Sequence, residues 1–253
     1  MRLAGKITRR VWSFAMPNWK RCLMLRLGGV KIGKGTYIAW GSRIGDKVII
    51  GKSVRINKDC IIGNNVEIGD YTQIGKGTSV GPNVLIGKNV RIGRNTHIAN
   101  SIIGDHSFIE SGVFFTGFQE GKIKIGKNSY IGIYSVLDWS GDIEIGNCVH
   151  IAGPSVGIWT HTSVFQALSG DKLSDNRKKQ VTRVKIEDYV YIGGNSTIYP
   201  GVKIKSHSVV LPNTAVNKDV DAYLMVGGSP ASPKRKIEIT DEKIKFIKLR
   251  TTN

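Results

Sequence analysis

The sequence predicts an all-β fold in which the chain winds into a parallel solenoid, because aliphatic residues recur at every sixth position. Twelve such positions follow one another without a slip, from Ile32 to Ile98. A glycine usually follows the aliphatic residue, and a small or β-branched residue such as Thr36, Val48 or Cys60 stands four positions after it. After a jump in register, the pattern returns in shorter runs as far as Val216.

A period of six fits neither a helix nor an ordinary amphipathic strand. A glycine at every sixth position would cost a helix about 1 kcal/mol each time, and a half-buried strand alternates with period two and has no corners. Period six places the first and fifth side chains inside, separated by a bend where Gly, Asn and Asp tolerate a positive φ. Three short strands per coil then close a triangular prism, and the coils stack.

The pattern divides the chain into three parts. Residues 1–30 are expected to form a basic helical cap, which Pro17 splits into two short helices. Residues 31–222 form the solenoid, with a long loop at 157–184. Residues 223–253 form a tail with a short helix over 240–250, for which Thr240 is the N-cap.

The cysteines indicate packing and a reducing compartment. Cys22, Cys60 and Cys148 form no disulfide framework. Cys60 and Cys148 are both expected to point inward, as small apolar side chains do.

The loop at 157–184 is the longest departure from the repeat, and loops of this length are usually functional or disordered. It contains His161, which has no place in a hexad. The other four histidines stand at the sixth or fourth place of a hexad, where we expect surface residues: His97, His150, His106 and His207. The alternative role for His161 is a loop residue that caps backbone groups.

The hexads, together with a string of motifs around the loop, resemble the sugar and polysaccharide O-acetyltransferases of the hexapeptide-repeat superfamily. The motifs are "THT", "VKIEDYVYIGG", "YPGVKI", "VNKDV" and "GGSPA", in that order. The resemblance implies a left-handed parallel β-helix, a homotrimer with each active site between two prisms, and acetyl-CoA as donor. We expect no metal, because His97, His106 and His150 do not have the spacing of a carbonic-anhydrase-type site.

The resemblance makes His161 the general base. An imidazole can take a proton from an attacking hydroxyl near neutral pH and return it to the departing thiolate. A partner should fix its tautomer. Asp138 is the candidate and Asp142 a weaker one, the alternative for each being a corner acid in solvent.

The resemblance also suggests substrate contacts. The segment before the loop matches acceptor-binding positions of the family, although Tyr134 stands where the family has Asn. Asp138 and Trp139 could form a sugar platform, and Trp159 could join them. For both tryptophans the alternative is packing against a neighbouring subunit.

The donor site is expected on the coils after the loop. Tyr191 matches a family tryptophan, and the two glycines after it would let a pantetheine chain approach the backbone. Ser232 replaces a family arginine, so neighbouring basic residues would meet the nucleotide phosphate. For Lys234 and Arg235 the alternative is a solvated basic tail. The predicted cofactor-binding residues are Tyr191, Gly193, Gly194, Lys218, Lys234 and Arg235.

The net charge of +18 indicates an anionic partner. Residues 1–34 hold nine Lys or Arg and no acid, so this segment could contact an anionic bilayer in addition to capping the prism. No apolar run is long enough to span a membrane, and no clean signal-peptide core is present. We expect a cytoplasmic protein, peripheral at the inner face of the membrane, and no nucleic-acid binding, because no motif accompanies the charge.

The sequence therefore predicts an acetyl-CoA-dependent O-acetyltransferase that acts on a sugar, an oligosaccharide or a lipid-linked glycan. An N-acetyltransferase on an amino or nucleotide sugar is the near alternative. A metal enzyme of the carbonic-anhydrase type and a non-catalytic basic scaffold are the alternatives from other classes.

Overall fold

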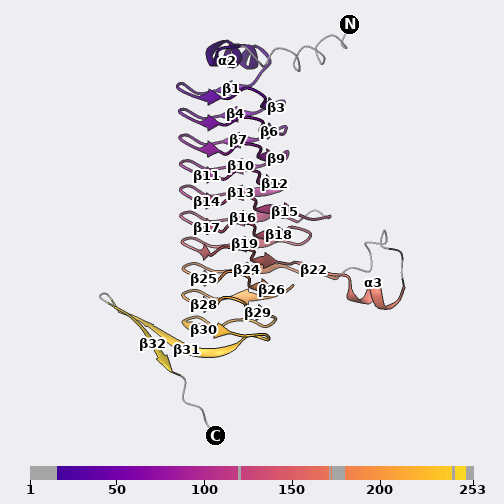
Figure 1. Cartoon of the computed structure of the whole chain (residues 1–253), viewed down its shortest axis with the longest axis vertical. Coiled ribbons are helices and arrows are strands. Elements are labelled where there is room, and N and C mark those ends of the chain that lie inside the picture. The colour runs from indigo at the N-terminus through magenta and orange to yellow at the C-terminus, as the bar shows by residue number, and fades with distance from the viewer. Residues whose placement is uncertain (1–15, 119–120, 171, 173–179, 241–242, 249–253) are drawn as a thin grey trace. The chain divides into compact units, whose positions relative to one another are not determined.

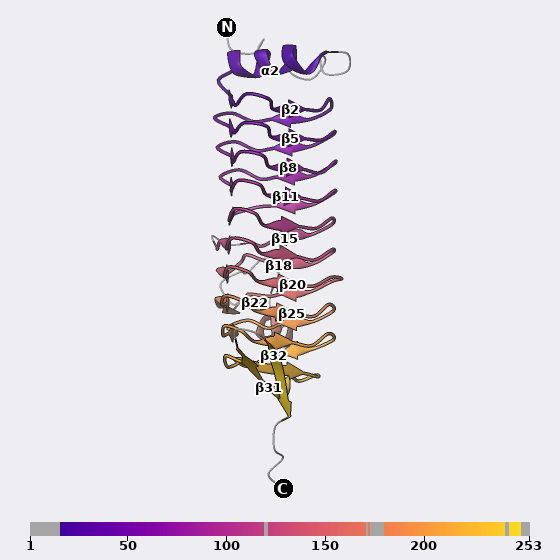
Figure 2. The same ribbon diagram turned by 90° about the vertical axis from the view of Figure 1, so that its left-hand side faces the viewer.

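The computed structural model describes residues 16–118, 121–170, 172, 180–240 and 243–248. It divides into two compact units, Met1–Gly112 (unit 1) and Val113–Asn253 (unit 2). Each unit is a parallel β-helix whose short strands stack on three faces, as Figures 1 and 2 show for the strands that they label. The all-β fold predicted from the hexads is confirmed.

Unit 1 contains one described helix and three stacks of two- and three-residue strands. Helix α2 spans Asn18–Leu27. Face A holds β1 (Lys31–Ile32), β4 (Ile49–Ile50), β7 (Glu67–Ile68), β10 (Leu85–Ile86) and β13 (Ser101–Ile103). Face B holds β2 (Tyr37–Ile38), β5 (Arg55–Ile56), β8 (Gln73–Ile74), β11 (Arg91–Ile92) and β14 (Phe108–Ile109). Face C holds β3 (Arg43–Ile44), β6 (Ile61–Ile62), β9 (Ser79–Val80) and β12 (His97–Ile98).

The register confirms that three hexads make one coil. Ile38 pairs with Ile56, which pairs with Ile74, each three hexads further along the chain. These side chains are fully buried, and burying one isoleucine contributes about 1.5–3 kcal/mol. The fourth place of the hexad is the corner, where residues such as Asn65 and Asn83 adopt a positive φ.

The second place of the hexad requires glycine for a different reason from the one that we expected. This glycine does not adopt a positive φ; instead it lies against the backbone of the next coil. A Cβ added to Gly75 would be 2.3 Å from the carbonyl oxygen of Gly93, and one added to Gly33 would be 2.5 Å from Lys52 N. The coils can stack this closely only where that side chain is absent.

Unit 2, taken by itself, also has three faces, which are given the letters A, B and C in the same order along the chain. Face A holds β16 (Ile123–Ile125), β19 (Ile143–Ile145), β24 (Val184–Ile186) and β27 (Lys203–Ile204). Face B holds β17 (Tyr130–Ile131), β20 (His150–Ile151), β25 (Tyr191–Ile192), β28 (Val209–Val210) and β30 (Leu224–Gly227). Face C holds β15 (Phe114–Thr116), β18 (Val136–Asp138), β21 (Gly157–Ile158), β26 (Thr197–Ile198) and β29 (Ala215–Val216).

The long loop leaves unit 2 between face C and face A. Gly157 and Ile158 still belong to the coil, because β21 pairs with β18 and β26. The chain then departs through β22 (His161–Thr162) and the short helix α3 (Val164–Leu168), which project from the stack of coils (Figure 1). It returns through β23 (Gln180–Val181), which pairs with β22 in antiparallel fashion.

The helix expected over residues 240–250 is wrong. After β30 the chain forms a hairpin from β31 (Ser232–Ile239) and β32 (Ile244–Lys248). The cross-strand pairs include Ile239 with Ile244 and Ile237 with Phe246, so apolar residues recur with the period of a strand. Thr240 belongs to the turn, where its backbone N–H donates to the Lys243 carbonyl.

The predictions for the cap and the cysteines have mixed outcomes. A helix begins directly after Pro17, as expected, whereas the first of the two predicted helices falls on residues 1–15, outside the described residues.

All three cysteines are free; Cys60 is buried, but Cys148 is exposed. The inward orientation of Cys148 is therefore wrong, because this residue occupies a corner with φ 55° and its neighbour Val149 points inside.

Candidate active site

The candidate site lies in unit 2, where the long loop leaves the coil. Asp138 is the last residue of β18, and His161 opens β22. Because β18 and β21 are adjacent strands of face C, with Leu137 opposite Ile158, the chain passes Asp138 as it leaves the stack. Stacking of the coils thus brings together two residues that are 23 positions apart.

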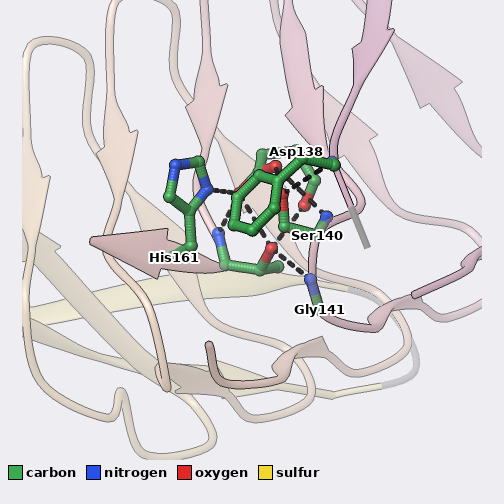
Figure 3. A network of polar contacts seen from close by, with 6 residues as sticks. Asp138, Ser140, Gly141 and His161 are labelled. Carbon is green, nitrogen blue, oxygen red and sulfur yellow. Dashed lines mark hydrogen bonds and ion pairs between the residues drawn. The ribbon is translucent and has the colours of Figure 1, made fainter. Parts of the chain in front are cut away.

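His161 contacts Asp138 directly. Its Nδ1 lies 2.6 Å from Asp138 Oδ2, and Figure 3 shows the imidazole directed at the carboxylate. The Asp138 side chain is completely buried, whereas 24% of the His161 side chain is exposed. A carboxylate can only accept hydrogen bonds, so Nδ1 carries a proton, and in the neutral imidazole Nε2 is then the nitrogen with the lone pair.

Four other groups hold the Asp138 carboxylate. Oδ1 accepts from the Ser140 hydroxyl at 2.6 Å and from the Ser140 N–H at 3.2 Å. Oδ2 accepts from the Thr160 N–H at 3.0 Å and lies 2.8 Å from the Thr160 hydroxyl. That hydroxyl accepts from the Gly141 N–H at 2.7 Å. Residues of the turn after β18 and the residue directly before the excursion therefore fix the carboxylate in place (Figure 3).

These contacts decide the charge of Asp138. Burial is the largest influence and by itself would raise the pKa of the carboxyl group. Hydrogen bonds from Ser140, His161 and Thr160 outweigh it, and the pKa of Asp138 lies below its ordinary value. The carboxylate is thus ionised near neutral pH and can stabilise a proton on the imidazole.

Phe118 packs on His161, and Trp139 packs against the residue that precedes Phe118. The rings of Phe118 and His161 meet edge to face, with centroids 4.8 Å apart, which restricts rotation of the imidazole. The Trp139 indole packs over Gly117, where an added Cβ would lie 2.6 Å from Trp139 Cδ2. Trp139 Nε1 is buried and has no hydrogen-bond partner among the described residues.

The predicted acceptor residues differ in how close they lie to the His161–Asp138 pair. Trp159 follows β21, with its indole Nε1 2.8 Å from where a Cβ on Gly157 would lie, so the ring folds back over its own strand. Tyr134 is exposed at a corner with φ 58°, at the opposite end of β18 from Asp138. The fully buried Asp138 carboxylate contacts His161 and offers no exposed surface to an acceptor.

Asp142, the weaker candidate for a partner of His161, has another partner. Its Oδ2 accepts from Arg183 Nη2 at 3.3 Å, and Arg183 also lies 3.6 Å from Glu144. Of the two acids, Asp138 is the one that contacts the imidazole.

Two of the predicted donor residues, Tyr191 and Arg235, lie on face B, whereas His161 lies in the excursion that follows face C. Tyr191, on face B, is exposed and stacks on His150, whose ring also stacks on Tyr130. Strand pairing places Tyr191, Val209, Met225 and Arg235 at matching positions of successive strands, and these four residues form a row on face B.

The remaining donor residues have local explanations or lie in solvent. A Cβ on Gly193 would be 2.4 Å from Pro212 N and one on Gly194 2.5 Å from Gly153 O, so packing between coils accounts for both glycines. Lys218 and Lys234 are exposed, and Lys234 Nζ donates to Ser232 Oγ at 2.9 Å.

The sequence reasoning missed Ser140, Thr160 and Phe118. Thr160 is part of the "THT" motif, and Ser140 lies two residues after Asp138. Phe118 follows β15 in a shorter departure from the repeat, "TGFQEGK", which carried the same signal as the long loop. In the described part of the chain, no three His, Cys, Asp or Glu side chains are grouped as metal ligands.

Comparison with known families supports the assignment by motif. The family model described as bacterial transferase hexapeptide (six repeats) matches residues 41–76, 71–101 and 83–117, and that of the hexapeptide repeat of succinyl-transferase matches residues 183–218. The chain is 32% identical over 143 residues to galactoside O-acetyltransferase of Lactococcus lactis, an alignment that covers 56% of this chain and 66% of that protein. These matches support the hexapeptide-repeat acyltransferase superfamily as the family that this chain resembles.

Two further comparisons concern the fold and another class of protein. The structure of UDP-N-acetylglucosamine acyltransferase from Francisella novicida superposes with a TM-score of 0.58 at 23% identity, over 79% of this chain and 68% of that chain. This likeness shows the left-handed parallel β-helix. Gamma carbonic anhydrase 1 of Arabidopsis thaliana is 28% identical over 144 residues, 53% of this chain and 50% of that protein. The chain thus matches only half to two thirds of the length of these curated relatives.

Proposed function

We propose that this protein is an O-acetyltransferase that moves an acetyl group from acetyl-CoA to a hydroxyl of a sugar or glycan, with His161 as general base. The observation that carries the proposal is the contact between His161 Nδ1 and the buried, ionised Asp138. It leaves Nε2 as the basic nitrogen of a part-exposed side chain at the point where the chain leaves the coil. The family provides the acyl-transfer chemistry that such a base would serve.

The reaction needs no covalent enzyme intermediate. Nε2 of His161 takes the proton of the acceptor hydroxyl while its oxygen attacks the thioester carbonyl. The tetrahedral intermediate then collapses, the carbon–sulfur bond breaks, and the proton on Nε2 passes to the departing thiolate of coenzyme A. Asp138 stabilises the transient imidazolium and holds the ring through Nδ1.

For the acceptor, Trp139, Trp159 and Tyr134 are our candidates for contact. All three flank β18 or β21 on face C of unit 2, and aromatic rings can pack on the C–H faces of sugars. Galactoside O-acetyltransferase, the relative in Lactococcus lactis, carries a sugar acceptor in its name, which supports this class of acceptor.

For the donor, we propose the row on face B of unit 2. Tyr191 and Arg235 belong to that row through strand pairing, and Lys218 and Lys234 would add charge for the nucleotide phosphates. His161 lies beyond face C and the row lies on face B, so a site that contains both would need a neighbouring copy of the chain.

We therefore propose a homotrimer, which light scattering after gel filtration tests. We also propose a cytoplasmic location, which cell fractionation tests.

The deciding experiment incubates the purified protein with acetyl-CoA and a panel of neutral sugars, amino sugars and nucleotide sugars. We expect a thiol to be released only with an accepting sugar, and mass spectrometry with NMR to locate the acetyl group on oxygen. The same reaction with His161→Ala should release almost no thiol. Acetyl on nitrogen would indicate the N-acetyltransferase alternative.

Two further outcomes would point to other classes. Stoichiometric zinc, together with hydration of carbon dioxide, would favour the carbonic-anhydrase alternative that one relative suggests. Absence of both coenzyme A binding and thiol release would favour a non-catalytic scaffold.

A further inference from the structure

Helix α2 of unit 1 is the second feature of the chain that the repeat does not explain. Its inner side is fixed to the first coil. The Asn18 side chain donates to the Thr36 carbonyl at 3.0 Å and accepts from the Ile38 N–H at 2.9 Å, and Cys22, one turn further along, is buried. The helix therefore has a defined orientation on the coil.

The outer side of α2 carries large apolar residues. Trp19, Leu23 and Leu27 are spaced four apart, which places them on one stripe of a helix. Their exposed fractions are 63%, 48% and 81%. Met24 is 50% exposed beside the stripe. The helix thus has its largest apolar side chains on the side away from the protein core.

Cations accompany this stripe. Lys20 is exposed, with its Nζ 5.3 Å from the centre of the Trp19 ring, whereas the Arg26 guanidinium donates to the Ile32 carbonyl of the first coil, at 3.3 Å from Nε and 2.8 Å from Nη2. The first 45 residues of the sequence contain ten Lys or Arg and no Asp or Glu. An apolar stripe with Trp, flanked by cations, is the composition of helices that lie in the interface of an anionic bilayer.

The size of the stripe also favours a membrane over a protein partner. A helix of ten residues is about 15 Å long, so a stripe one side chain wide covers on the order of 150 Å². A stable protein interface needs about 800 Å² on each side. Shallow insertion into a bilayer has no such threshold, since electrostatic attraction adds to the burial of a few side chains.

We propose that the outer face of α2 is a membrane-docking surface for anionic phospholipid, with Trp19, Leu23 and Leu27 inserted and Lys20 at the headgroups. No helix in the described part of the chain is long and apolar enough to cross a bilayer. The docking does not depend on the reaction proposed for unit 2.

Flotation of the full chain with vesicles tests the proposal. We expect binding to phosphatidylcholine vesicles that contain phosphatidylglycerol, and little binding to pure phosphatidylcholine. The variant Trp19→Ser/Leu23→Ser/Leu27→Ser should bind at least about tenfold more weakly, because its inserted surface is lost. Lys20→Gln should weaken binding about fivefold at low salt, and added salt should reduce the effect.

A matched control replaces three exposed apolar residues of the other described helix. Val164, Phe165 and Leu168 of α3 are 56%, 60% and 82% exposed, and their combined replacement by Ser should leave vesicle binding unchanged. Circular dichroism checks that each variant is folded. Wild-type protein that fails to bind anionic vesicles, or equal binding by the α2 variant, would overturn the proposal. So would a change of oligomeric state in that variant without loss of vesicle binding, because the occupant would then be a second copy.

Discussion

The two units use the same hexad, but they differ in the polar groups that they bury. In unit 1, buried threonines such as Thr72 and Thr78 donate to the carbonyl of the adjacent coil, at 2.8 Å in both cases. Unit 2 has similar buried hydroxyls and, in addition, Asp138, the only buried acidic residue among those described. Hydroxyls at the fifth place of the hexad therefore form hydrogen bonds between adjacent coils, whereas the buried carboxylate binds a histidine that lies outside the coils.

The difference follows from interruption of the repeat. The described coils of unit 1 run from β1 to β14 with corners but no long excursion. Unit 2 departs after β15 and again after β21, and the residues that contact His161 or its partner come from these departures and from the end of β18. In a regular coil every side chain points either into the core or into solvent. A site that joins a buried carboxylate to a part-exposed histidine therefore requires a departure from the repeat.

The largest expected effect separates the histidines of the two units. His161→Ala should lower the rate of acetyl transfer by about 10²–10⁴-fold, the usual contribution of a general base. His106→Asn in unit 1 should leave the rate unchanged, because Asn tolerates the positive φ of 61° at that exposed corner. Steady-state kinetics with circular dichroism measures both. Equal rates for His161→Ala and the wild type would contradict the assignment of the base.

Asp138→Asn should have the next largest effect. The amide keeps the shape of the carboxylate but does not favour the proton on Nδ1, so kcat should fall about 100-fold or more while KM changes little. Stopped-flow or steady-state assays at neutral pH measure the two parameters separately. A change confined to KM would instead assign Asp138 to substrate binding.

Two buried threonines offer a matched test of structural against functional hydroxyls. Thr160→Val and Thr72→Val each remove a buried hydroxyl that both donates and accepts a hydrogen bond, and each should cost about 1–3 kcal/mol of the free energy of unfolding. Only Thr160→Val should also lower kcat, on the order of tenfold, because the Asp138 carboxylate would shift. Urea unfolding and kinetics are the measurements. Equal kcat for the two variants would remove Thr160 from the positioning network.

The smallest expected effect is the dependence of stability on pH. The pKa of Asp138 is lower in the folded state than its ordinary value, so the folded state binds fewer protons there than the unfolded chain does. The stabilisation is present above the unfolded-state pKa, about 3.9, and is lost as pH falls through the folded-state pKa. Unfolding of wild type and Asp138→Asn in urea at pH 6 and pH 3 should show their difference in stability shrinking at the lower pH. A constant difference would mean that ionisation of Asp138 does not stabilise the fold.

Much of the architecture could be predicted from the sequence because the signal is local and repeated. The buried aliphatic positions, the corners with positive φ and the departure near His161 all appear as predicted. The C-terminal helix was wrong, because the period-two pattern of Ile244 and Phe246 is short and its partner strand, β31, lies beyond the repeat. Cys148 was placed inside because it was counted at the fifth place of a hexad, whereas counted from Ile145 it stands at the fourth place, which is the corner.

The site could be predicted only in part. His161 was recognisable because it has no place in a hexad, and Asp138 was one of two candidate partners. The choice between Asp138 and Asp142 required the structure, in which Asp142 meets Arg183 instead. Gly193 and Gly194 have the composition of a cofactor-binding loop, yet their contacts are with Pro212 and Gly153 of neighbouring coils.

The sequence by itself determined the coil, since six-residue spacing sets which side chains enter the core and which residues make the corners. Only the tertiary structure decided which residues meet across coils. Contacts such as His161 to Asp138 join positions more than twenty residues apart, and their pairing depends on which strand lies above which and on where the chain leaves the stack. The same is true of α2, whose outer apolar stripe became visible only when its inner side was seen fixed to the first coil by Asn18 and Cys22.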